Sequence, residues 1–123
     1  GKESRRQGLL FMNDEIRKSC IDILQAAEEI QNFTHGMDFK AYQKSPITQR
    51  AVERDFEIIG EALNRIRQID AELIEKVSGY HRIIGFRNIL IHGYDIIDEM
   101  IVWKAVENHL PILIKKVKEI LDA

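Results

Sequence analysis

The spacing of the apolar residues constrains the fold of this chain more than any other feature. Ile16, Cys20, Ile23, Ala27 and Ile30 recur at alternating intervals of four and three residues. This spacing places apolar side chains on one face of an α-helix, and it returns in later parts of the chain. No segment of any length shows the period-two alternation of a β-strand. We therefore expect an all-α protein, an up-and-down helical bundle with about four to five main helices.

Capping residues and helix breakers divide this pattern into segments. We expect helices over about residues 13–34, 46–68, 71–77 and 80–92, a short turn of helix after Asp38, and a last helical region that begins at Asp98. Asn13 or Asp14 is expected to cap the first helix, and Thr34-His35-Gly36 to end it. Pro111 interrupts the last region, so we expect the helix to kink or restart near Asn108.

Length and charge limit the classes of function. The chain has 123 residues, enough for one domain. Its 18 Lys and Arg stand against 20 Asp and Glu, and the net charge of −2 excludes a generally basic coat. Any nucleic acid must therefore bind at a local basic patch, for which Arg50, Arg54 and Arg82 are candidates. The single cysteine, Cys20, excludes an internal disulfide framework and a zinc site with several cysteines.

We expect the first residues of the chain to be less well ordered than the rest. Residues 13–123 are expected to form the bundle domain, and residues 1–12 a leader that is partly disordered or derived from the expression vector. No apolar run approaches the roughly 20 residues that cross a bilayer, and Leu9–Met12 is too short for a signal peptide. We therefore expect a cytoplasmic protein with no membrane partner.

Polar residues gather at the end of the predicted helix over residues 80–92. The residues three and four positions away from Arg87 are all apolar, so its guanidinium projects from the buried side or the edge of the helix. In that position it requires a carboxylate, helix carbonyl groups or a bound anion as partner. His92 follows five residues later, Asn88 lies one turn before His92, and Tyr94 comes after a helix-ending Gly93.

These residue types suit cleavage of RNA without a metal. A guanidinium binds phosphate oxygens, and an imidazole exchanges protons near neutral pH. The ribose 2′-hydroxyl would supply the nucleophile, and the protein would supply proton transfer and charge neutralisation. The spacing also fits a structural role, in which Arg87 pairs with Glu61 or Asp55, His92 caps the helix and Tyr94 packs on the bundle. From the residues alone, both interpretations stay open.

The sequence around these residues resembles a known family. Arg87–Tyr94 is similar to the R-x4-H-x-Y motif of the HepT-like branch of the HEPN superfamily, and Asn88 fits the polar residue after the arginine. Phe33–Phe39 resembles the first interhelical loop of the family, and Glu57–Ala62 its second-helix signature. Val102-Trp103 and Leu110-Pro111 lie where the family places its final helix. The resemblance covers about residues 13–121.

The resemblance implies a function. Members of the family are small all-helical homodimers that act as ribonuclease toxins, each paired with a minimal nucleotidyltransferase antitoxin. By this resemblance, Arg87 binds and stabilises the scissile phosphate of an RNA substrate, and His92 is the general acid and base. Asn88 supports the pair, and a carboxylate such as Glu61 would hold the arginine in place. Tyr94 is the implied acceptor of AMP from the antitoxin.

Other interpretations remain beside this one. The chain could instead be a non-catalytic helical partner or substrate of a nucleotidyltransferase. A pocket for a small molecule or nucleotide is a third possibility, but no phosphate-binding glycine loop supports it. His35, His81, His109 and Cys20 have no metal-ligand spacing, so we interpret them as structural or surface residues. We expect no cofactor and no metal.

Overall fold

The computed structural model describes residues 13–77, 79–85 and 98–122. These residues form helices and turns without a strand, which confirms the all-α prediction for the described ranges. In chain order the elements are α2 (Asp14–Phe33), α3 (Phe39–Gln43), α4 (Pro46–Ile69), α5 (Ala71–Ile74), helical residues 80–85, α7 (Glu99–Lys104), the π-helix η1 (Ala105–His109) and α8 (Leu110–Asp122). The expected leader, residues 1–12, lies outside the described residues, as do residues 86–92 of the expected fourth helix.

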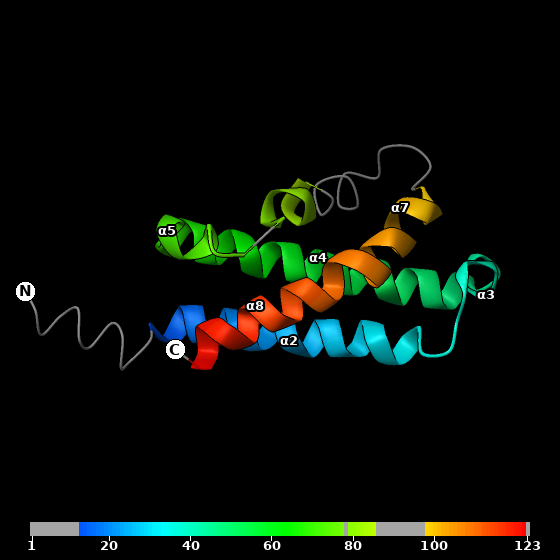
Figure 1. Cartoon of the computed structure of the whole chain (residues 1–123), viewed down its shortest axis with the longest axis horizontal. Helices are drawn as coiled ribbons and strands as arrows, with labels where there is room; N and C mark the ends of the chain where they lie inside the picture. Colours follow the sequence, from blue (N-terminus) through cyan, green and yellow to red (C-terminus); the bar gives the residue numbers. More distant parts are fainter. Residues whose placement is uncertain (1–12, 78, 86–97, 123) are drawn as a thin grey trace, which may run out of the picture.

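Two long helices form the frame of the bundle. In Figure 1, α2 and α4 lie side by side and α8 crosses in front of them. In the same view, α5 and residues 80–85 lie on the side of α4 away from α2. Thus α4 separates α2 from the segment that leads towards Arg87.

Side-chain caps fix where the helices begin. Asn13 accepts hydrogen bonds from the backbone N–H groups of Glu15 (2.8 Å) and Ile16 (3.2 Å), so Asn13 rather than Asp14 caps α2. Asp38, Asp70 and Asp98 cap the starts of α3, α5 and α7 with hydrogen bonds of 2.8, 3.1 and 2.9 Å. Each bond satisfies a backbone donor that has no partner within its helix.

One helix ends earlier than the sequence indicates. The expected helix over residues 71–77 stops as α5 at Ile74. The N–H groups of Lys76 and Val77 bond carbonyl groups three residues back, at 3.1 and 2.9 Å. Val77 is buried, and Gly79 has a φ of 80°, which suits glycine. A tight turn that buries Val77 therefore replaces the last helical turn.

The predicted spacing matches the buried faces of α2 and α4. Ile23 and Ile30 of α2 have no exposed surface, and neither do Ile59 and Leu63 of α4. Burial of such side chains stabilises the fold by about 1.5–3 kcal/mol each relative to exposure. The seam between the two helices is thus the main apolar core of the described residues.

The last helical region contains the interruption expected from Pro111. The π-helix η1 spans Ala105–His109, and α8 begins at Leu110. Proline has no N–H to donate to the carbonyl four residues back, and its ring crowds that carbonyl. The wider π turn accommodates both the missing hydrogen bond and the proline ring. The prediction of a restart near Asn108 is therefore confirmed.

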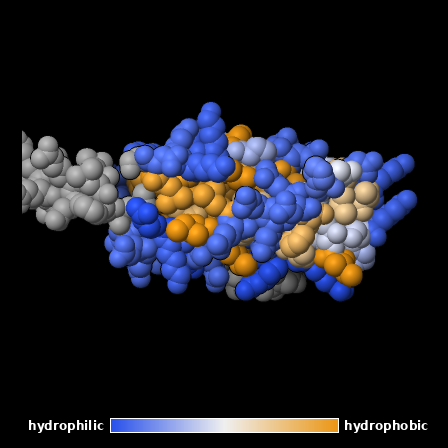
Figure 2. Space-filling model, turned by 90° about the horizontal axis from the view of Figure 1, so that it is seen from below, coloured by the Kyte–Doolittle hydropathy of each residue, from blue (hydrophilic) through white to orange (hydrophobic). Residues whose placement is uncertain are grey.

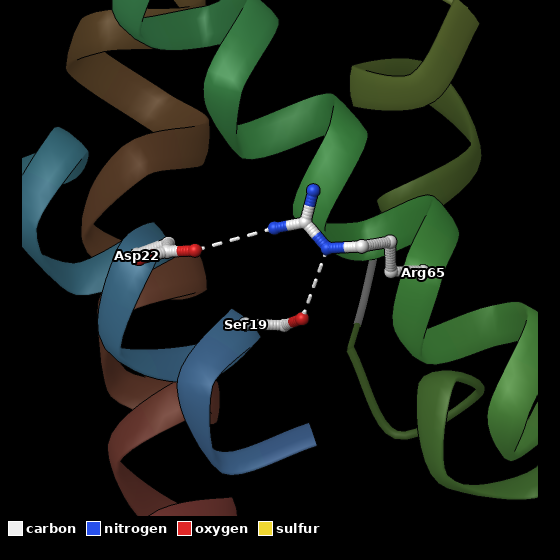
Figure 3. A network of polar contacts seen from close by, with 3 residues as sticks. All are labelled: Ser19, Asp22 and Arg65. Atoms are coloured by element: carbon white, nitrogen blue, oxygen red, sulfur yellow. Dashed lines mark hydrogen bonds and ion pairs between the residues drawn. The ribbon is translucent and has the colours of Figure 1, made fainter. Parts of the chain in front are cut away.

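A polar contact joins the two long helices (Figure 3). Arg65 of α4 donates from Nε to Oγ of Ser19 and from Nη2 to Oδ2 of Asp22, both at 3.3 Å. Ser19 is buried, so the guanidinium satisfies a hydroxyl that water does not reach.

The surface is mostly hydrophilic but carries apolar patches on the face shown in Figure 2. Exposed large apolar residues include Ile47 and Ile101, which are 79% and 60% exposed. Among the described helices, none has the length and apolar content needed to cross a membrane.

Candidate functional site

The structure describes only some of the residues that the sequence predicts for the site. Arg87, Asn88, His92 and Tyr94 lie outside the described residues. Glu61 is described and lies on the exposed side of α4. Asp55, the other carboxylate considered as a partner for Arg87, is 4% exposed on the same helix. Pairing of Arg87 with either carboxylate therefore stays a prediction.

The helical residues 80–85 show how the chain approaches Arg87. Ile83 and Ile84 are buried, whereas His81, Arg82 and Gly85 are exposed. This division gives the segment one apolar face against the core and one face towards solvent. The chain therefore comes within two residues of Arg87 on an anchored helical turn.

Tyr80 anchors the start of this segment. Its hydroxyl donates a 2.8 Å hydrogen bond to Oε1 of Glu75, which follows α5. Burial, followed by the hydrogen bond and the charge of Glu75, raises the pKa of Tyr80 above its ordinary value. The phenol consequently stays protonated at neutral pH. Its ring also lies 3.8 Å from the ring of His81, measured between centroids. Tyr80 therefore has a structural role at this position.

The charges on α4 limit where RNA can bind. On α4, burial and then the charge of Glu57 raise the pKa of Glu53. Glu99 of α7 adds to this shift, and Arg50 opposes it. Arg54 donates to Oε2 of Glu57 at 3.2 Å, so part of its charge is compensated. The carboxylates of Glu53 and Glu57 thus offset the positive charge that Arg50 and Arg54 would offer a phosphate backbone. All three candidates for the local basic patch, Arg50, Arg54 and Arg82, are exposed.

The remaining candidate residues show no metal-binding arrangement in the described ranges. There, no group of three or more His, Cys, Asp or Glu side chains is placed to hold a metal ion. His35 and His81 are exposed. Cys20 is fully buried, and burial raises the pKa of its thiol to about 11. Cys20 is therefore an unreactive core residue at neutral pH.

The burial of one carboxyl group was not anticipated from the sequence. Asp55 of α4 is 4% exposed, and its Oδ2 has no hydrogen-bond partner among the described residues. Burial, followed by the nearby carboxyl group of Glu29 from α2, raises the pKa of Asp55 to about 7, although Arg54 opposes this shift. The sequence does contain a signal for it, because Asp55 directly precedes Phe56 in the apolar series Val52, Phe56, Ile59, Leu63 and Ile66, which repeats the four-and-three spacing. A charged residue at a core position requires a partner or a shifted pKa.

Comparisons with known proteins identify the family. Residues 23–120 match the family described as "Ribonuclease HepT-like". A "Putative RNase" from Methanocaldococcus jannaschii is 34% identical over 85% of this chain and 94% of the relative. A "Putative RNase" from Caldanaerobacter subterraneus subsp. tengcongensis is 37% identical over 81% of this chain and 88% of the relative.

A third relative carries the family name itself. The "Probable ribonuclease HepT" of Thermococcus cleftensis is 35% identical over 75% of this chain and 83% of the relative. No match to a solved structure was found. The match over residues 23–120, which contains the stretch Arg87–Tyr94 and most of the described helices, shows that this chain belongs to the HepT-like ribonuclease family.

Proposed function

We propose that this protein is a metal-independent endoribonuclease toxin in which Arg87 and His92 carry the reaction. The observation that carries the proposal is the R-x4-H-x-Y pattern at Arg87, His92 and Tyr94, inside the region that matches the HepT-like ribonuclease family. The names of the relatives support ribonuclease activity as the general class.

The proposed reaction uses the RNA itself as nucleophile. The ribose 2′-oxygen attacks the adjacent phosphorus, a bond from phosphorus to the 2′-oxygen forms, and the bond to the 5′-oxygen of the next nucleotide breaks. A base accepts the proton of the 2′-hydroxyl, and an acid donates a proton to the departing 5′-oxygen. His92 is proposed to take part in this proton transfer, and Arg87 to neutralise the charge that grows on the phosphate.

The described residues support this proposal because they hold the helical segment that leads to Arg87. A catalytic pair is effective only when its backbone is held firmly. Buried Ile83 and Ile84, together with the Tyr80–Glu75 hydrogen bond, hold the helical segment that precedes Arg87. Exposed Arg82 on the same segment adds positive charge on the solvent side.

The proposed partners are a second copy of the chain and a minimal nucleotidyltransferase. Strongly exposed Ile47 and Ile101 offer apolar surface that a partner would cover favourably. In the proposed neutralisation, the phenol oxygen of Tyr94 attacks the α-phosphorus of ATP, pyrophosphate leaves, and the phenol proton goes to solvent. Tyr94→Phe should abolish incorporation of labelled AMP by the partner enzyme, and this variant should still cleave RNA at the wild-type rate.

Inducible expression in a bacterial host tests the toxin proposal. Wild type is expected to stop growth and degrade cellular RNA, whereas Arg87→Ala and His92→Ala do neither. His81→Ala is the matched control, because His81 is an exposed histidine of the helical segment 80–85 and lies outside the motif. Circular dichroism would verify that each variant folds. If folded wild type leaves growth and RNA intact, the toxin proposal is wrong and a non-catalytic partner of a nucleotidyltransferase is favoured.

A further inference from the structure

One stretch of the sequence differs in charge from the chain as a whole. Residues 76–94 contain Lys76, Arg82 and Arg87 but no Asp or Glu, although about one residue in six of the chain is acidic. A local excess of positive charge is what a protein of negative net charge needs to bind a polyanion. The structure describes the start of this stretch, and in Figure 1 residues 80–85 lie on the side of α4 away from α2.

The turn at Gly79 leaves the side chains of Lys76 and Arg82 in solvent. The N–H group of Lys76 bonds a carbonyl group three residues back at 3.1 Å, and the next residue, Val77, is buried. The N–H groups of Arg82 and Ile83 bond the carbonyl group of Gly79 at 3.1 and 3.4 Å, and Ile83 is buried. Lys76 and Arg82 are thus exposed cations on a backbone held by hydrogen bonds and buried neighbours.

No carboxylate in the described part of the chain neutralises these two cations. There, neither Lys76 nor Arg82 forms an ion pair. Glu75 is the acidic residue nearest to them in the sequence, and its Oε1 accepts a 2.8 Å hydrogen bond from the hydroxyl of Tyr80. Burial and Glu75 raise the pKa of Tyr80, and Arg67 opposes this shift, so a further cation lies near the same hydrogen bond.

The other arginines considered for RNA binding have carboxylates beside them. Arg54 is 67% exposed but donates to Oε2 of Glu57 at 3.2 Å. Burial and the charge of Glu57 raise the pKa of Glu53, and Arg50 lies close enough to oppose this shift. A phosphate that approached Arg50 or Arg54 would therefore also meet negative charge, which weakens its binding.

We propose that Lys76 and Arg82 bind phosphates of the RNA strand that flank the cleaved bond, and that Arg50 and Arg54 do not. This inference rests on the proposed ribonuclease function, because it names residues that hold the substrate of that reaction. Both residues precede Arg87 in the same acid-free stretch. Contacts to phosphates do not depend on base sequence, so they would strengthen binding to single-stranded RNA in general.

Fluorescence anisotropy with a labelled single-stranded RNA tests the proposal. Each ribose of this RNA carries a 2′-O-methyl group, so the probe cannot be cleaved through its 2′-oxygen. The association constant is measured over a range of KCl concentrations for wild type, Lys76→Gln and Arg82→Gln. Arg50→Gln and Arg54→Gln are matched controls that make the same change in charge, and Arg82→Lys keeps the charge of Arg82. Circular dichroism verifies that each variant folds.

The expected results follow from counterion release. Each lost phosphate contact should make the slope of the logarithm of the association constant against the logarithm of the salt concentration shallower by about 0.7. At about 0.1 M KCl, this corresponds to binding that is about fivefold weaker for Lys76→Gln and for Arg82→Gln. The other three variants should keep the wild-type slope. A wild-type slope for Lys76→Gln or Arg82→Gln, or an equal change in Arg50→Gln or Arg54→Gln, would overturn the proposal.

Cleavage of an unmodified RNA by wild type separates this proposal from the proposed function. If wild type cleaves RNA but Lys76→Gln and Arg82→Gln bind the probe with the wild-type slope, only the assignment of these two residues is wrong. If the slopes change as expected but wild type does not cleave, the RNA-binding residues are confirmed and the proposed ribonuclease activity is wrong.

Discussion

Replacing Arg65 by methionine tests the polar contact between the two long helices. The substitution keeps most of the apolar stem of the side chain and removes both hydrogen bonds of the guanidinium, to Ser19 and Asp22. In Figure 3 these groups project towards one another from α4 and α2. Arg65→Met therefore isolates the polar contribution of this contact to stability.

The expected loss follows from exposure. The side chains of Arg65 and Asp22 are 47% and 31% exposed, so solvent screens their ion pair, which should contribute about 0.2–1 kcal/mol. Ser19 is 2% exposed, and loss of its charged donor should cost about 1 kcal/mol. The free energy of unfolding should fall by about 1–2 kcal/mol in total.

Urea unfolding at pH 7 measures this loss, with Arg54→Met as control. Arg54 is 67% exposed and bonds Glu57 at 3.2 Å within its own helix, so its loss should cost less than about 0.5 kcal/mol. In a double-mutant cycle with Asp22→Asn, the coupling to Arg65 should be about 0.2–1 kcal/mol and should weaken in high salt. Equal losses from Arg65→Met and Arg54→Met would refute the reasoning.

Three further substitutions or measurements test other parts of the fold. Leu63→Ala removes a side chain with no exposed surface and should reduce the free energy of unfolding by about 2–5 kcal/mol; a loss below 1 kcal/mol in urea would contradict its place in the core. Gly36→Ala should cost about 1–2 kcal/mol by thermal unfolding. The cost would be purely conformational, because Gly36 has a φ of 75° and an added Cβ would meet nothing within 4 Å. Cys20, whose thiol has its pKa raised by burial, should resist a thiol reagent at pH 8 in the native protein and react after unfolding, and rapid native reaction would show that it is accessible.

Local sequence signals predicted most of the described helices. The four-and-three spacing located the buried faces of α2 and α4, because helix geometry alone decides which residues share a face. Caps such as Asp70 and Asp98 act on backbone N–H groups two or three residues away. Pro111 likewise exerts its effect on the turn directly before it. These features depend on neighbours in the chain, which the sequence displays.

Contacts between helices could not be predicted in the same way. The contacts of Arg65 with Ser19 and Asp22 depend on how α2 and α4 are rotated and shifted against each other. Spacing within one helix does not determine that rotation. For the candidate site, the sequence motif alone supplied the residues, and the described structure supplied the anchored segment that precedes them.

The central claim is that Arg87 and His92 cleave RNA without a metal. The most direct measurement incubates purified wild type, Arg87→Ala, His92→Ala and the control His81→Ala with a labelled RNA in the presence of EDTA, and analyses the product ends. The account predicts cleavage by wild type and His81→Ala, with 2′,3′-cyclic phosphate ends, and none by the two motif variants. Cleavage by folded His92→Ala at the wild-type rate, or loss of wild-type cleavage in EDTA, would contradict it.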